Sequence, residues 1–194
     1  MFRRPATLRA VYELRTYDIK PKYFPDYLAL TSEKFGLRVA HSKLLGFWIA
    51  EIGGQNQVVH IWEYDSLMQR KAVRDALGKD AQWGAEYLAH ARKYFAKQDS
   101  VFMTTDKDIK AATQPFYRLW QGPLSAAGSH AHHAHLLGEW KIGAGGPDGQ
   151  IVRLYAGDNL DNIAKGAMEA DSGTGFGKLM LPAPFSSKYC SLWK

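Results

Sequence analysis

The chain has 194 residues and a formal net charge of +6, with 46% hydrophobic and 23% charged residues. This composition is ordinary for a globular protein, and no apolar run of about 18 residues could form a transmembrane segment. A single cysteine, Cys190, excludes an internal disulfide framework and favours a reducing compartment.

The N-terminal segment, residues 1–10, carries three arginines and no acidic residue. From residue 106 onwards, nine basic residues face eight acidic ones, so the charge forms no basic stripe and no nucleic-acid partner is expected. Two interpretations of the segment remain open on composition. It is a mitochondrial targeting remnant, or it is an ordinary frayed terminus.

The first predicted elements are a strand over residues 11–19 and a helix over residues 24–39. The strand alternates aromatic and polar residues, and the helix has apolar residues at helical spacing with Pro25 near its start. Two β-prone runs around the turn cluster GGQNQ then predict a hairpin over residues 44–64.

Two helical segments follow this hairpin. The first has Ser66 as N-cap, with Gln69 completing a capping box, and ends at Gly78. Its apolar face is Ala72, Val73, Ala76 and Leu77; the face of the second segment is Trp83, Tyr87, Ala91 and Tyr94. Residues 100–105 are predicted to form a strand.

The second half of the chain repeats much of this pattern. LLGFW, which starts at residue 44, returns as LLGEW at residue 136, and the turn GGQNQ returns as GGPDG. Residues 116–124 resemble the first strand, Asp158 and Asn159 are candidate N-caps, and residues 186–194 are predicted to form the last strand. The spacing between strand and hairpin is 13 residues shorter than in the first half, so the first helix of this copy is shortened or lost.

The predicted fold class is α+β, with two tandem ferredoxin-like βαββαβ repeats. The expected units are repeat 1 over residues 11–105, a linker over 106–114 and a degenerate repeat 2 over 115–194. Helices cover only one face of such a sheet, so two sheets meeting face to face would form one pseudo-symmetric α/β barrel.

Three stretches, YELRTYDIKP, AHSKLLGFWIAEIGGQNQVVHIWEYDS and RKAVRDALGKDAQW, resemble the NIPSNAP family across residues 11–103. The resemblance implies a dimeric α/β-barrel fold and, as for most members, a mitochondrial protein. For some members it implies a matrix protein that is displayed on damaged mitochondria and recruits autophagy receptors. The second repeat departs from the family pattern, because GSHAHHAHLLGEW stands in place of most of the first helix.

A ligand pocket is predicted from strand alternation, which places Glu13, Arg15 and Tyr17 on one face of the first strand and His60, Trp62 and Tyr64 on one face of the third. These six residues are expected to face the barrel interior, with Val59 and Ile61 packing against helices. A convergence of polar groups in an apolar cleft is typical of ligand sites. The alternative is an internal ion pair and a hydrogen-bonded histidine without a functional role.

Histidines supply the remaining candidates. His41 precedes the first hairpin, where a helix C-terminus favours a histidine; a heme ligand is the alternative, by analogy with other barrels of this fold. The candidate metal tract is His130, His132, His133 and His135. No Cys, Asp or Glu lies within that tract, so adventitious metal affinity is the competing interpretation.

The leading functional expectation is a NIPSNAP-like mitochondrial matrix protein that acts through protein partners, in mitophagy or as an assembly or structural subunit. No catalytic residue can be assigned, so a non-enzymatic role is favoured, and Trp83 and Tyr87 are either interface anchors or, as favoured, core residues. The alternative is a small-molecule- or heme-binding barrel, such as a cofactor-independent oxygenase. No other cofactor is expected. Apolar sheet left bare by the lost helix predicts a homo-oligomer or a larger assembly.

Overall fold

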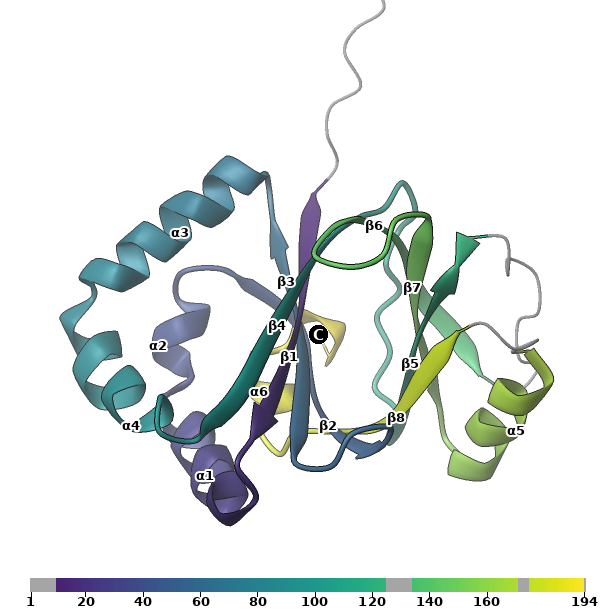
Figure 1. Ribbon diagram of the computed structural model, residues 1–194, viewed down its shortest axis with the longest axis horizontal. Coiled ribbons are helices and arrows are strands. Elements are labelled where there is room, and N and C mark those ends of the chain that lie inside the picture. The colour runs from purple at the N-terminus through teal and green to yellow at the C-terminus, as the bar shows by residue number, and fades with distance from the viewer. Residues whose placement is uncertain (1–9, 125–133, 171–174, 194) are drawn as a thin grey trace, which may run out of the picture.

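The computed structural model describes residues 10–124, 134–170 and 175–193, without the side chains of residues 166–170. Eight strands form a closed barrel in a mixed α/β fold, in the order β1-β3-β2-β8-β5-β7-β6-β4 (Figure 1). All neighbouring strands are antiparallel. Closure of these eight described strands leaves no exposed sheet edge among them, and eight strands enclose an interior that side chains can fill.

The first half contains β1 (Val11–Ile19), the 3-10 turn η1 (Pro21–Tyr23), α1 (Phe24–Lys34), α2 (Gly36–Val39), β2 (Lys43–Ile52), β3 (Gln57–Tyr64), α3 (Leu67–Lys79), the π-helical turn η2 (Trp83–Leu88), α4 (Ala89–Ala91) and β4 (Phe95–Thr104). The second half contains β5 (Phe116–Pro123), β6 (His135–Ala144), β7 (Gln150–Gly157), α5 (Leu160–Ala170), β8 (Phe176–Pro182), α6 (Ser186–Tyr189) and the 3-10 turn η4 (Ser191–Trp193).

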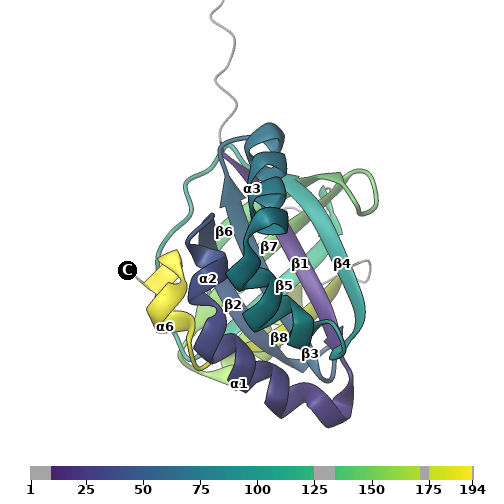
Figure 2. The ribbon, with the colours of Figure 1, turned by 90° about the vertical axis from the view of Figure 1, so that its left-hand side faces the viewer.

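The two halves have matching strand orders. The first half runs β4-β1-β3-β2 across the barrel wall and the second half runs β8-β5-β7-β6, and the halves join where β2 meets β8 and β4 meets β6. Helices lie outside the barrel. The helices of the first half cover its outer face, and α5 lies against β5 and β7 on the opposite side (Figures 1 and 2).

The barrel interior is apolar and is filled from both halves. Its buried side chains include Leu14, Val59, Ile61, Leu119, Leu137, Val152, Leu154 and Met180, together with the indoles of Trp48 and Trp140. A Cβ on Gly46 would lie 2.2 Å from the ring of Trp48, and a Cβ on Gly138 would lie 2.3 Å from the ring of Trp140. The repeated Gly-x-Trp pattern therefore has a packing cause, because each glycine leaves the space that an indole occupies.

The predicted orientation of β3 is wrong. Val59 and Ile61 belong to the interior cluster, whereas Trp62 and Tyr64 pack with the helices outside the barrel. The interior is packed with aliphatic and indole side chains and has no room for the polar face. The outer face lies under helices that leave a solvent path, so charged groups are tolerated there.

The last strand was also predicted in the wrong place. β8 is Phe176–Pro182, within the glycine- and proline-rich stretch, whereas residues 186–193 form α6 and η4. Lys178 of β8 pairs with Leu119 of β5 in the barrel wall. Leu192 of η4 is buried in the interior cluster. Glycine and proline in this stretch argued against a strand. β8 nevertheless forms, because it pairs with β2 on one side and with β5 on the other.

One residue of each predicted cap pair, Ser66 of Asp65-Ser66 and Asn159 of Asp158-Asn159, caps its helix. The Ser66 side chain accepts a hydrogen bond from the Gln69 backbone N–H at 3.0 Å, and Asn159 Oδ1 accepts one from the Asn162 N–H at 3.1 Å. The reciprocal half of the capping box is absent, because the buried Gln69 Oε1 has no hydrogen-bond partner among the described residues. On α3 the predicted face is only half right, since Val73 is buried but Ala72 is exposed.

The expected bare sheet of the second half is not found on β5 and β7. Trp120, Ile151 and Tyr155 on the outer face are only 1–3% exposed. Most of the segment that would hold the shortened first helix, residues 125–133, lies outside the described residues, as do residues 1–9 with the candidate targeting segment. Within the described part of the chain, no helix is long and apolar enough to cross a membrane.

Candidate functional site

A cavity of about 340 Å³ lies between the outer face of the first-half sheet and the surrounding helices. Figure 2 looks onto this side of the molecule, where α1, α2 and α3 cross in front of the strands. The six residues of the predicted pocket, Glu13, Arg15, Tyr17, His60, Trp62 and Tyr64, all line it. The structure thus brings these residues together, but outside the barrel rather than inside it. We call this space the helix–sheet cavity.

Glu13 on β1 is the carboxylate of the helix–sheet cavity. It is 3% exposed and accepts hydrogen bonds from Arg70 Nη2 and Ser100 Oγ, both at 2.5 Å, while Arg15 Nε lies 3.7 Å away. Burial by itself would raise the pKa of Glu13. The Arg70 hydrogen bond, the Arg15 charge and the Ser100 hydrogen bond outweigh burial and lower the pKa to about 2.

Arg38 on α2 is the buried cation of the cavity, and it was not among the site residues predicted from the sequence. Its guanidinium is stacked 3.8 Å from the centre of the Trp62 ring, and it donates to Ser42 Oγ at 2.5 Å and to Tyr64 Oη at 3.0 Å. No carboxylate of the described residues lies within ion-pair distance of it. The spacing from Thr31 and Phe35 could have revealed Arg38, because positions seven and three residues before it share its helix face.

His60 on β3 is 3% exposed and is held in one tautomer. The Trp62 indole can only donate, and its Nε1 lies 2.6 Å from His60 Nδ1, so Nδ1 accepts and the proton of the neutral ring is on Nε2. That Nε2 has no hydrogen-bond partner among the described residues. Burial, followed by the charge of Arg15, lowers the pKa of His60 well below its ordinary value.

His60 lines the cavity, unlike the predicted heme candidate His41, but its tautomer does not suit a heme ligand. An axial ligand needs an unprotonated ring nitrogen, whereas Trp62 occupies Nδ1 of His60 and leaves the proton on Nε2. His41 does not line the cavity, and its Nε2 lies 3.0 Å from Asp80 Oδ2. His60 therefore offers no free lone pair to a heme iron in this cavity, and His41 lies outside the cavity.

The histidine tract lies mostly beyond the structure. His130, His132 and His133 are outside the described residues, and His135 is an exposed residue at the start of β6. Among residues 10–124, 134–170 and 175–193, no group of three or more potential metal ligands comes together.

Aromatic side chains form the apolar wall of the cavity. Trp83 and Tyr87 stack with ring centres 4.3 Å apart, and both are buried, so the prediction that they are core residues is confirmed. The π-helical turn η2 carries both rings, and such turns are frequent at functional sites. Thr31 and Tyr87 hydroxyls lie 3.1 Å apart, which fixes the wall to α1.

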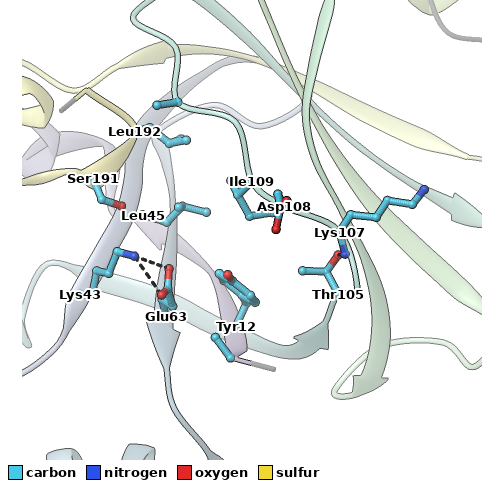
Figure 3. A pocket seen from close by; sticks show the side chains of 12 residues that line it. Tyr12, Lys43, Leu45, Glu63, Thr105, Lys107, Asp108, Ile109, Ser191 and Leu192 are labelled. Atoms are coloured by element: carbon cyan, nitrogen blue, oxygen red, sulfur yellow. Dashed lines mark hydrogen bonds and ion pairs between the residues drawn. The ribbon is translucent and has the colours of Figure 1, made fainter. Parts of the chain in front are cut away.

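A second cavity of about 600 Å³ lies at one end of the barrel (Figure 3). Lys43 and Glu63 at its rim pair with each other at 2.9 Å, and Lys107 pairs with Glu139 at 2.5 Å. Burial, followed by the charge of Glu63, raises the pKa of Tyr12 in its wall to about 12. This second cavity is larger, but the lysines and glutamates named here already pair with one another. The helix–sheet cavity is therefore the stronger candidate site.

Comparison with known proteins extends this picture. The NIPSNAP family model matches residues 12–108. Protein NipSnap homolog 3B from Mus musculus is 42% identical over 89 residues, a match that covers 45% of this chain and 36% of that protein. The chain therefore matches only about a third of the length of that relative.

Two solved structures show the extent of the likeness. An uncharacterized NIPSNAP domain protein from Burkholderia xenovorans is 32% identical with a TM-score of 0.47, over 49% of this chain and 93% of that one. An anthrone oxidase-like protein is 7% identical with a TM-score of 0.61, over 90% of this chain and 91% of that one, which is a likeness of fold alone. The family model spans half of the sequence and includes every strand and helix around the helix–sheet cavity. The chain belongs to the NIPSNAP family.

Proposed function

We infer that this protein binds a small molecule in the helix–sheet cavity, and that its function is binding without bond-breaking chemistry. The observation that carries the inference is Arg38, which is 5% exposed, lines the cavity and lacks a carboxylate partner among the described residues. Burying a cation without a counter-charge is costly. An occupant of the cavity that accepts hydrogen bonds would offset this cost.

The protonation states favour binding over catalysis. Glu13 has a pKa of about 2 and accepts hydrogen bonds from Arg70, Ser100 and Tyr64, so it is a weak base. Protonation of His60 is opposed by burial, and its free nitrogen already carries the proton. Burial raises the pKa of Tyr87 to about 12, which makes it a weak acid. No residue of this set has the near-neutral pKa that suits a general acid or base.

Native mass spectrometry of the purified full chain, with an absorption spectrum of the same sample, tests the proposal. A molecule released on denaturation is the expected result. Gly78 lines the cavity and Gly84 does not, and a Cβ on either glycine would have no described neighbour within 4 Å. Gly78→Phe should therefore obstruct the cavity and lose the molecule, and Gly84→Phe should keep it.

Equal retention by both variants would move the site away from the helix–sheet cavity. A Soret band in the absorption spectrum would overturn the argument that the histidines here cannot ligate heme.

The finer architecture supports a single site per chain. The matching strand orders and the shared Gly-x-Trp packing support two tandem ferredoxin-like repeats, over residues 11–105 and 115–194, with a linker over 106–114. In this proposal the second repeat has lost the site, because its outer face is filled by Trp120 and Tyr155.

A role through protein partners in the mitochondrial matrix, including mitophagy or assembly, is the second proposal. It rests on family membership and on two exposed apolar residues at the start of α3, Leu67 at 50% and Met68 at 74% exposure. Fractionation of cells that express the tagged full chain tests the location, and native mass spectrometry tests homo-oligomers. A monomer found only outside mitochondria would overturn this second proposal.

A further inference from the structure

The geometry points to a ligand class for the helix–sheet cavity: a small organic carboxylate with a planar apolar body. This inference rests on the proposed function of the cavity and adds the chemistry of its occupant. Three features lead to it, namely an excess of guanidinium groups, unused hydrogen-bond donors and an aromatic wall.

The charges that line the cavity are unequal. Its lining includes one carboxylate, Glu13, and four guanidinium groups, Arg15, Arg38, Arg74 and Arg92. Glu13 is already engaged by Arg15 and by Arg70, which lies outside the lining. The cavity therefore carries more positive charge than its own carboxylate can balance, which favours an anion.

The deepest guanidinium has donors to spare. Arg38 uses one N–H toward Ser42 and one toward Tyr64, and an arginine has five. Its planar fork matches a carboxylate in two parallel hydrogen bonds, which are stronger than bonds between neutral groups. Trp62 stacks on its face at 3.8 Å and leaves the edge of the fork for the ligand.

Two further donors line the same cavity without hydrogen-bond partners among the described residues. They are His60 Nε2 and Arg15 Nε, which is paired with Glu13 by charge but lies 3.7 Å from it, beyond hydrogen-bond distance. Both present an N–H, since Trp62 fixes the histidine tautomer and arginine keeps its protons. Buried donors of this kind require an acceptor, and a carboxylate brings two oxygens with about four acceptor positions.

Much of the remaining lining is apolar, and most of it is aromatic. Phe35, Leu77, Leu88 and the stacked pair Trp83 and Tyr87 surround the cavity. Offset stacking and edge contacts favour a planar ligand against such walls. At about 340 Å³ the cavity is near the small end of the range for ligand sites, which suits an acid of one or two rings.

The mouth of the cavity carries exposed cations. Arg74 on α3 and Arg92 after α4 are exposed and belong to the lining. Charges of one sign at the mouth of a cleft raise the local concentration of counter-ions and the association rate, and salt screens this effect.

Calorimetric titration of the full chain with 2-naphthoate and with 2-naphthamide tests the inference, because the two probes share shape and differ in charge. We expect 2-naphthoate to bind at least about tenfold more tightly, since hydrogen bonds from a guanidinium to a carboxylate are stronger than those to a neutral amide. Arg38→Lys should weaken the binding of 2-naphthoate by about tenfold, because an ammonium group cannot form the two parallel hydrogen bonds that a guanidinium makes to a carboxylate.

Two surface variants keep the test independent of folding. Arg92→Gln should slow naphthoate association and reduce its salt dependence, whereas Lys71→Gln, on an exposed residue outside the lining, should change neither. Equal binding of the two probes, or a neutral molecule released from the native protein, overturns the carboxylate inference and leaves the binding function intact. Failure of both probes, with no released molecule from the native protein, overturns both.

Discussion

The outer faces of the two halves carry different cross-strand pairs at matching places. On the first half Arg15 of β1 stands opposite His60 of β3, whereas on the second half Trp120 of β5 stands opposite Arg153 of β7. The first pair lines a cavity with unused donors. In the second pair, the Arg153 guanidinium lies 5.3 Å from the Trp120 ring centre, and its Nε lies 2.7 Å from Glu139.

This difference shows how similar strand frameworks can lead to different surfaces. A Cβ on Gly122 would lie 2.3 Å from the Trp120 ring, and one on Gly175 would lie 2.4 Å from its Nε1, so the indole occupies the space beside two glycines. Arg153 has a carboxylate partner in Glu139, and Arg38 has none among the described residues. The outer face of the second half is therefore filled and its arginine is paired, whereas the outer face of the first half has a cavity and an arginine without a carboxylate partner among the described residues.

The interior does not share this divergence. Gly46 with Trp48 and Gly138 with Trp140 repeat the same packing, and each glycine follows a register shift in its strand. Packing within a closed barrel restricts both halves alike, because any extra volume inside must displace atoms from other strands. The outer faces are covered by different segments and can differ.

The largest expected effect comes from the carboxylate of the first outer face. Glu13→Gln should lower the free energy of unfolding at pH 7 by about 3 kcal/mol, because the folded pKa of about 2 lies well below the ordinary value of 4.5. A depressed pKa gives stability that is present above pH 4.5 and lost as the pH falls toward 2. Urea denaturation at several pH values measures both effects, and the variant should show a shallower loss in that range.

Glu63→Gln on the neighbouring strand is the matched control. Its partner Lys43 is 54% exposed, so this surface pair should contribute less than about 1 kcal/mol. If the two variants lost the same stability, the Glu13 cluster would stabilise the fold no more than a surface ion pair, which would contradict the prediction.

Removing the glycines beside the interior indoles should have the next largest effect. Gly46→Ala and Gly138→Ala should each destabilise the barrel by about 1–3 kcal/mol, because the new Cβ overlaps the ring of Trp48 or Trp140. Chemical denaturation of the two variants compares the halves directly. Similar losses would support common interior packing, and a loss confined to one variant would contradict it.

Gly78→Ala controls for the chemistry of that change. Gly78 lies in α3, and no described atom lies within 4 Å of the position that its Cβ would occupy. Alanine should therefore stabilise the protein by about 0.5–1 kcal/mol through helix propensity. The same chemical denaturation measures this gain.

Apart from the control variants, the smallest expected effect concerns the helix caps. Ser66→Ala and Asn159→Ala should each cost about 1 kcal/mol, because each removes an acceptor for a backbone N–H in the first turn of α3 or α5. Thermal unfolding followed by circular dichroism measures the losses. Ser66→Asp should retain most of the stability, and an alanine variant as stable as the parent would show that the cap is dispensable in that half.

Local patterns in the sequence predicted much of the first half. Alternation grouped Glu13 with Arg15 and His60 with Trp62, and all four residues line one cavity. Hydroxyl and amide residues before apolar runs located the N-caps at Ser66 and Asn159. These features depend on neighbours within a few residues along the chain, which a single sequence displays directly.

Alternation could not decide which face of β3 turns inward. A period of two sorts the residues into two faces but does not show which face points into the barrel. That choice depends on the other seven strands, whose side chains leave no room inside for the polar face. The same limit hid β8, which is a strand because β2 and β5 pair with it, and Arg38, whose contacts come from Trp62 and Tyr64 on another element. Local patterns predicted the first three strands of the first half, its helix cap and its polar groupings, but β4 begins at Phe95, well before the predicted start at residue 100. Contacts between distant segments determine which face forms the barrel interior and which lines the cavity.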